Sequence, residues 1–411
     1  MIRVSRWAAA AAAVLGCGVA FGPAPARAAA DPNQAVMELA ERAVPAVVDL
    51  RVVSGGPAAQ ILGRERRGTG VLVDAQGHIL TANYVVAGAE EILVTLADGR
   101  RAMGGLAGSD PESGLAVVRI PALPNLRHVP LGRSQGLRLG QFVMVVASQG
   151  GVKRAVSAGL VSAFPEFTGY WEYQLPRVLQ TNLPTPSGGY GAPLLEAGGS
   201  VVGVMAFSES DAPQTSFGIP VELIAGVFGE LVKEGRVKSR PARPWLGLYA
   251  APAAEGVGVA GVTPGGPADR ADLRRGDIIT QVDGKPMPGR EEFYAELWKG
   301  IVGDVMDLTV LRGNELIPVK VRSRDRIDYF RPPRPAVAGP APEAAKRSWS
   351  PVGPASWAGT CCGGWPRATR RCAACCAAGP CRRGSRPRGK SPRGTCATWR
   401  PWRRPWPGRA R

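Results

Sequence analysis

The stretch G-T-G-V-L-V-D-A-Q-G-H-I-L-T-A-N-Y-V-V, from Gly68 to Val86, decides the fold class of this chain. Two short strand-like runs, at 68–73 and 78–82, flank the turn residues D-A-Q-G, which is the pattern of two β-strands joined by a tight turn. Strands this short predict a barrel or a sandwich when many of them recur along a chain.

Similar runs occur on both sides of this stretch. Apolar or alternating segments separated by turn residues lie at 92–96, 115–120, 142–147 and 201–207. The segment from Gln34 begins as an amphipathic helix and becomes a strand after Pro45. Helical periodicity returns at 220–232. We therefore expect a mostly β domain over 31–235, followed by a charged linker at 236–244.

A second, smaller unit is expected over 245–324. Its strand-like runs lie at 257–262, 277–282, 306–311 and 317–321, and its predicted helix lies at 288–298. No regular alternation of helix and strand is present, so the unit is not predicted to contain a parallel sheet.

The net charge of +18 suggests a nucleic-acid partner only until the charges are located. No Asp or Glu follows Glu343, whereas 16 Lys and Arg residues do, which leaves a charge of +2 for the rest of the chain. The body of the protein is therefore nearly neutral, and we expect no nucleic-acid partner.

The basic C-terminal segment has an unusual composition. From Lys346 onward Arg, Pro, Gly, Ala, Cys and Trp dominate, and the segment holds six of the 10 Trp and seven of the 8 Cys residues. Such a composition cannot assemble an apolar core, so 332–411 is predicted to be a disordered tail. Residues 346–411 resemble GC-rich coding sequence read out of frame; a genuine Arg/Trp-rich tail and a membrane-active segment are the alternatives. Cys372 and Cys375 lack the further ligands of a zinc site.

The N-terminus has the pattern of an export signal. Arg3 and Arg6 precede an apolar run at 7–20, and Ala26-Arg27-Ala28 supplies small residues for cleavage. The run is shorter than the ~20 residues of a spanning helix. We predict a signal peptide at 1–28, a periplasmic or cell-envelope location and no spanning segment after processing. Lipid attachment at Cys17 is the minor alternative.

Several stretches resemble the HtrA family of trypsin-like serine proteases. The stretch from Gly68 to Val86 is similar to the family's segment ending T-N-x-H-V-V, and D-P-E-S-G-L-A-V-V-R-I at 110–120 resembles the segment ending D-L-A-V-L-K-I. T-N-L-P-T-P-S-G-G-Y-G-A-P-L-L at 181–195 aligns without gaps to T-D-x-x-I-N-P-G-N-S-G-G-P-L-L, and 217–220 matches F-A-I-P. The resemblance implies a trypsin-like double β-barrel.

On these motifs all three catalytic positions are replaced. Tyr84 stands at the histidine position, Gly114 at the aspartate position and Tyr190 at the nucleophile position. A phenol with a pKa of about 10 is neutral at pH 7 and is no base, and glycine has no side chain to orient one. Loss of a serine-protease triad lowers the rate on the order of 10⁶-fold. We therefore expect no catalytic residues and an inactive site.

No other residue is predicted to rescue catalysis. The two histidines, His78 and His128, are interpreted as solvated loop residues, and Ser187 as an ordinary turn former. Gly188 is the remnant of the turn whose N–H groups would form an oxyanion hole. The two large replacements suggest a further hypothesis, that Tyr84 and Tyr190 pack together as an aromatic plug in the cleft.

The smaller unit resembles a PDZ domain of the HtrA type. The resemblance rests on W-L-G-L at 245–248 and G-V-G-V-A-G-V-T-P-G-G-P-A-D-R-A-D-L-R-R-G-D-I-I-T-Q-V-D-G-K-P at 256–286. It implies that Trp245, Leu246, Gly247 and Leu248 form the loop whose backbone N–H groups hold a peptide's C-terminal carboxylate. Close approach of a carboxylate leaves no room for a side chain at Gly247. The alternative is a PDZ domain that docks on the barrel and binds nothing.

The sequence therefore predicts an HtrA-like pseudoprotease that binds unfolded or C-terminal peptide segments, in a chaperone-like, scaffold or regulatory role. The competing prediction, from the family alone, is an active trypsin-like serine endopeptidase of protein quality control. Neither requires a cofactor or a metal. Family members often form trimers through their barrels, but 31–44 lacks an aromatic residue that would anchor such contacts. A homotrimer therefore stays open.

Overall fold

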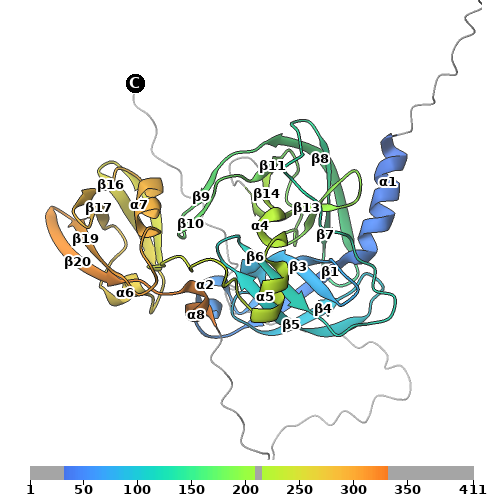
Figure 1. Cartoon of the computed structure of the whole chain (residues 1–411), viewed down its shortest axis with the longest axis horizontal. Helices are drawn as coiled ribbons and strands as arrows, with labels where there is room; N and C mark the ends of the chain where they lie inside the picture. Colours follow the sequence, from blue (N-terminus) through green and yellow to red (C-terminus); the bar gives the residue numbers. More distant parts are fainter. Residues whose placement is uncertain (1–31, 209–214, 332–411) are drawn as a thin grey trace, which may run out of the picture. The chain divides into compact units, whose positions relative to one another are not determined.

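The computed structural model describes residues 32–208 and 215–331, and both ranges belong to one unit of the chain (Figure 1). The signal peptide expected at 1–28, Cys17 within it, and the tail expected at 332–411 lie outside the described residues. The described part is mostly β, as predicted. It contains no helix that combines the length and the apolar character of a membrane span.

The first six strands form a closed barrel in the order β1-β2-β3-β6-β5-β4, which β4 closes by pairing with β1. They are β1 (Val47–Ser54), β2 (Glu65–Leu72), β3 (His78–Ala82), β4 (Ala89–Thr95), β5 (Arg101–Asp110) and β6 (Leu115–Arg119). All five residues of β3 are buried, although the strand includes the polar side chains of His78 and Thr81. The predicted change from helix to strand near Pro45 is confirmed, because α1 (Pro32–Ala43) and a 3₁₀ turn (Val44–Ala46) lead directly into β1.

A second closed barrel follows in the order β11-β14-β13-β12-β7-β8. Its strands are β7 (Phe142–Ser148), β8 (Arg154–Ala163), β11 (Leu179–Thr181), β12 (Pro193–Glu196), β13 (Val201–Ser208) and β14 (Ser216–Pro220). Between β8 and β11 the chain forms a separate hairpin of β9 (Phe167–Gly169) and β10 (Tyr173–Leu175).

Short helices complete the barrel region: α2 (Gly56–Leu62), α3 (Asn83–Val86), α4 (Glu222–Ala225) and α5 (Phe228–Glu234). The single helix predicted at 220–232 is wrong. Gly226 and Val227 separate α4 from α5, and Val227 leaves the helical conformation with φ −116° and ψ 5°. Glycine has a low helix propensity, which accounts for a break at this point.

The C-terminal part is a small α+β domain around one sheet in the order β15-β16-β17-β19-β20, with β18 paired to β17. Its strands are β15 (Leu248–Ala253), β16 (Gly256–Val262), β17 (Ile278–Val282), β18 (Lys285–Pro286), β19 (Val305–Arg312) and β20 (Glu315–Arg322). Its helices are α6 (Pro267–Arg270), α7 (Arg290–Leu297) and α8 (Arg326–Phe330), and α7 lies within the predicted helix at 288–298.

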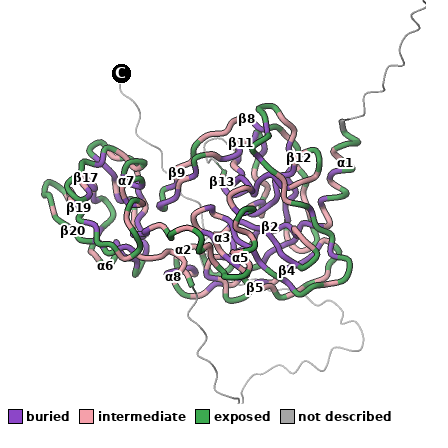
Figure 2. Tube along the Cα trace, viewed as in Figure 1, coloured by how far each residue is buried: buried purple, intermediate pink, exposed green. Residues whose placement is uncertain are grey.

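The buried residues follow the strands of both barrels and of the smaller sheet (Figure 2). One apolar cluster joins the first barrel to residues of the second, including Met144, Leu195 and Ile219. A separate cluster around Phe293 and Tyr294 forms the core of the C-terminal domain. The barrel elements are therefore fixed against one another by a shared core, which positions the loops between them.

Candidate functional site: a cleft without a triad and a carboxylate-binding loop

Tyr84 lies on α3, a single helical turn directly after the buried strand β3. Arg66 holds the end of this turn, because its Nε donates to the Val85 carbonyl at 3.1 Å and its Nη2 donates to Ser54 Oγ at 2.7 Å and to the Ala87 carbonyl. Burial lowers the pKa of Arg66 to about 10. Sequence reasoning missed Arg66. It is the second residue of β2, between the exposed Glu65 and Arg67, so its side chain points to the opposite, buried face of the strand.

The rings of Tyr84 and Tyr190 contact each other edge to face, with centroids 5.6 Å apart and an interplanar angle of 75°. The predicted packing of these two rings is therefore confirmed. The Tyr84 hydroxyl is buried without a hydrogen-bond partner, and burial together with the nearby Tyr190 raises the pKa of the Tyr84 phenol. Tyr190 Oη lies 3.0 Å from Ser208 Oγ. Tyr84 thus stays neutral and cannot accept a proton from a nucleophile.

Gly114 lies in the turn between β5 and β6 and lines the same cavity as the two tyrosines. Its φ is +77°, and a Cβ at this position would lie 2.5 Å from the hydroxyl oxygen of Tyr173. The Gly114 carbonyl accepts a hydrogen bond from Asn83 N at 2.8 Å. The space that a carboxylate side chain would need here is therefore occupied.

The turn before Tyr190 is tied to β2. Thr69 Oγ1 donates to the Gly188 carbonyl at 2.7 Å, and Thr69 N donates to the Tyr190 carbonyl at 2.9 Å. Gly188 adopts φ +75°. The turn is thus held in place although no serine stands at its end, and its role as an oxyanion-hole remnant stays a prediction.

In the part of the chain that the structure describes, neither His78 nor His128 lines the cavity that Tyr84, Gly114 and Tyr190 share. The interpretation of His78 as a solvated loop residue is wrong: it begins β3, it is buried, and its Nδ1 lies 2.6 Å from Asp74 Oδ2. The Asp74 turn and the edge of Phe228 enclose the His78 ring, which turn signals alone could not reveal. His128 is exposed outside any helix or strand, and Ser187 is exposed in a turn, as predicted.

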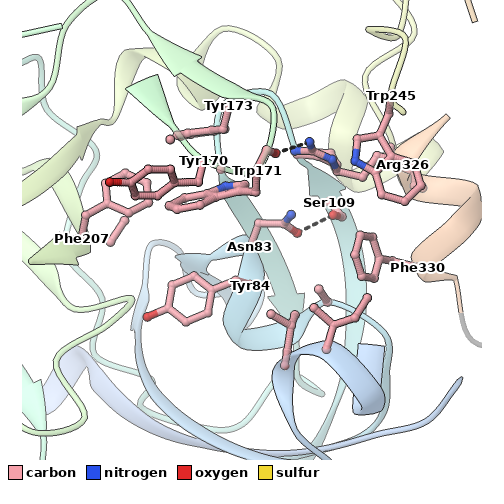
Figure 3. Close-up of a pocket in the computed structure, with 18 of the residues that line it drawn as sticks. Asn83, Tyr84, Ser109, Tyr170, Trp171, Tyr173, Phe207, Trp245, Arg326 and Phe330 are labelled. Carbon is pink, nitrogen blue, oxygen red and sulfur yellow. Dashed lines mark hydrogen bonds between the residues drawn. The ribbon is translucent and has the colours of Figure 1, made fainter. Parts of the chain in front are cut away.

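The cavity itself is large, with a volume of about 1220 Å³, so the two tyrosine rings do not fill it. Aromatic side chains from the β9–β10 hairpin form much of its wall (Figure 3). Phe167 stacks on Phe207 with centroids 4.3 Å apart, and Trp171 stacks on Tyr173 at 6.0 Å. Sequence reasoning missed this wall, because only the fold brings the hairpin's aromatic side chains against Phe207 of β13. Ser109, which also lines the cavity, donates to Asn83 Oδ1 at 2.6 Å, and an amide is no general base.

The loop predicted to hold a carboxylate is formed by Trp245, Leu246, Gly247 and Leu248, all of them buried. Gly247 adopts φ +79°, and a Cβ there would lie 3.0 Å from the Trp245 ring. The backbone N–H groups of Leu246, Gly247 and Leu248 all donate to the side-chain carboxylate of Glu172. The structure therefore brings the loop's donors together on one carboxylate. Within the described ranges, no group of three His, Cys, Asp or Glu side chains is arranged to bind a metal.

The double barrel, its cleft and the appended small sheet define a trypsin-like peptidase fold with a C-terminal PDZ domain. Residues 68–204 match the model of a trypsin-like peptidase domain, and residues 238–322 match that of a PDZ domain.

Similar proteins come from bacteria and plants. A probable periplasmic serine endoprotease, DegP-like, from Halomonas elongata is 32% identical over 281 residues, 63% of this chain and 57% of that protein. The putative serine protease HhoA of Synechocystis is 31% identical over 63% of this chain and 72% of its own length. The putative protease Do-like 14 of Arabidopsis thaliana is 31% identical over 68% and 69%. The chain belongs to the HtrA family of trypsin-like, PDZ-containing proteins.

Among solved structures, an HtrA-type protease, AlgW, determined with a decapeptide is 29% identical; the match covers 71% of this chain and 98% of that chain with a TM-score of 0.45.

Proposed function

We propose that this protein is a catalytically inactive HtrA-family member of the cell envelope that binds polypeptide segments or protein C-termini through its PDZ domain, in a chaperone-like, scaffold or regulatory role. One observation carries the proposal. Tyr84, Gly114 and Tyr190 line one cavity, and none of the three supplies a base or a nucleophile placed for acyl transfer. The N–H groups of 246–248 converge on a single carboxylate, that of Glu172, and a terminal carboxylate is the group that a C-terminal peptide would present to them.

The competing function is that of a working serine endopeptidase. The names of the relatives favour it, since they are called proteases or endoproteases. Export by the segment at 1–28 and a periplasmic location are part of the proposal and agree with the name of the Halomonas protein.

The cleft is expected to be catalytically inert. The purified full chain is expected to show no covalent labelling by a fluorophosphonate and no hydrolysis of casein, because no imidazole adjoins a hydroxyl in the cavity. Labelling is read by intact-mass spectrometry, with an active trypsin as positive control. A phosphonylated serine at any position would establish the endopeptidase instead.

The PDZ loop is expected to recognise the terminal carboxylate of a peptide. The full chain is expected to enrich octapeptides with a free C-terminus over the same pool carrying C-terminal amides. Gly247→Ala should weaken binding of the free-carboxylate pool about tenfold, about 1.4 kcal/mol, because the new methyl group meets Trp245 at 3.0 Å and the backbone has φ +79°.

Gly265→Ala is the matched control, since Gly265 also has positive φ, +68°, but no atom lies within 4 Å of its added Cβ. It should bind the pool as the unaltered chain does. Equal enrichment of free and amidated peptides would refute the proposed peptide-binding function.

A further inference from the structure

Glu172 is a charged residue enclosed at the tip of the β9–β10 hairpin. Its side chain has 0% exposure, and its backbone has φ +53°, in the left-handed region. Its Oε2 accepts from Leu246 N at 3.0 Å and Gly247 N at 3.4 Å, and its Oε1 accepts from Leu248 N at 3.2 Å. These three N–H groups are the donors that a PDZ domain offers to the terminal carboxylate of a peptide.

The main chain next to Glu172 also lies where a peptide would lie. Ala250 N on β15 donates to the Tyr170 carbonyl at 2.7 Å, a bond of the kind that an added strand makes. From α7, the Tyr294 hydroxyl donates to the Gly169 carbonyl at 3.0 Å and accepts from Glu172 N at 2.9 Å. Residues 169–172 therefore contact the carboxylate loop, the β15 edge and α7 at once.

Helix α8 stabilises this arrangement from a fourth side. Arg326 Nη2 donates to the Trp171 carbonyl at 2.6 Å (Figure 3). It also donates to the Glu172 carbonyl at 2.9 Å and lies 3.9 Å from Glu172 Oε2. A buried carboxylate loses its hydration, and it is tolerated in a protein only when hydrogen-bond donors and an opposite charge replace the lost water. The hairpin carries its buried charge because the PDZ loop and Arg326 supply both.

We propose that Glu172 is an internal ligand of the PDZ domain: residues 169–172 occupy the peptide groove, and a C-terminal peptide binds only after displacing them. This inference rests on the proposed peptide-binding function. The competition is direct, because the donors of 246–248 and Ala250 N cannot serve two acceptor chains together. The measured affinity for a peptide is then the intrinsic affinity multiplied by the fraction of molecules in which the groove is free.

Release of the hairpin is expected to depend on pH. Burial raises the pKa of Glu172 to about 7, while Arg326 and the three N–H groups oppose that effect. Of the other groups around it, Tyr294 has its pKa raised and Arg326 lowered by burial, and Arg290 lies near Tyr294. The Glu172 carboxyl has a higher pKa in the docked hairpin than in the released hairpin, so docking takes up a proton. Docking is therefore strongest at pH values below the pKa of the released carboxyl. It weakens as pH rises toward about 7. Peptide binding should therefore strengthen several-fold from pH 5.5 to pH 8.

The experiment compares full-length variants. Glu172→Gln places an amide N–H₂ group against backbone donors, and Arg326→Met removes the opposite charge while leaving the PDZ loop intact. Both should bind the free-carboxylate octapeptide pool at least about tenfold more tightly than the unaltered chain, measured by fluorescence anisotropy, and Glu172→Gln should lose the pH dependence. Glu166→Gln, an exposed glutamate just before the same hairpin, should bind like the unaltered chain.

Hydrogen–deuterium exchange of the 246–248 amides provides a readout that needs no peptide. These amides should exchange at least about tenfold faster in Glu172→Gln than in the unaltered chain or in Glu166→Gln. Unchanged affinity and unchanged exchange in both Glu172→Gln and Arg326→Met would overturn the internal ligand while leaving peptide binding intact. Faster exchange without peptide binding by any variant would instead refute the proposed function and, with it, the competition.

Discussion

Gly114→Asp is expected to lower the free energy of unfolding by about 3 kcal/mol, even though it returns a carboxylate to the position where the family motif has one. Two effects add. An L-residue at φ +77° is strained by about 1 to 2 kcal/mol, and the new Cβ would lie 2.5 Å from Tyr173 Oη. Urea unfolding of the full chain, followed by circular dichroism, measures the loss.

Tyr173→Phe separates the two effects. Alone it should be destabilising by about 1 kcal/mol, because the Tyr173 hydroxyl donates to the Ser113 carbonyl at 2.8 Å. In the Tyr173→Phe background Gly114→Asp should be less destabilising by about 1 kcal/mol, since the nearest atom is gone and the ring carbon at 3.1 Å remains. Additive losses in this double-mutant cycle, or a loss below about 1 kcal/mol for Gly114→Asp alone, would show that Tyr173 does not close the site.

Arg66→Ala is expected to have a comparable effect, a loss of about 3 kcal/mol in the free energy of unfolding. The substitution removes the buried donor to the Val85 carbonyl and to the Ser54 hydroxyl, and it leaves the Ala87 carbonyl with only the longer bond from Ser54 Oγ at 3.4 Å. It also opens a cavity below α3. Because α3 carries Tyr84, the contact between Tyr84 and Tyr190 should loosen as well. Thermal and urea unfolding report the first effect, and near-ultraviolet circular dichroism of the tyrosines reports the second.

Arg67→Ala is the matched control on the same strand. Arg67 is exposed, so its removal should change the free energy of unfolding by no more than about 0.5 kcal/mol. A similar loss for both arginines would mean that charge on β2, and not the buried hydrogen bonds of Arg66, supports the strand.

Much of the fold could be predicted from local pattern. The run H-I-L-T-A gave β3 with the bounds that the structure has, and the change from helix to strand at Pro45 was found because proline ends a helix. Strands of small or polar residues were missed. The β5 segment R-A-M-G-G-L-A-G-S-D has three glycines and mixed burial, and it is a strand because β4 and β6 pair with it on both sides.

The candidate site divides in the same way. The amino-acid sequence by itself determined that Tyr84, Gly114 and Tyr190 stand at the catalytic positions of the family motifs and that no base accompanies them there. It also indicated which loop offers N–H donors to a carboxylate. Only the tertiary structure decided that the Tyr173 hydroxyl fills the space beside Gly114, that Arg66 anchors α3, and that the carboxylate in the PDZ loop belongs to Glu172. These contacts join residues up to 76 positions apart. Their geometry follows from barrel closure and domain packing, which no local spacing of residue types encodes.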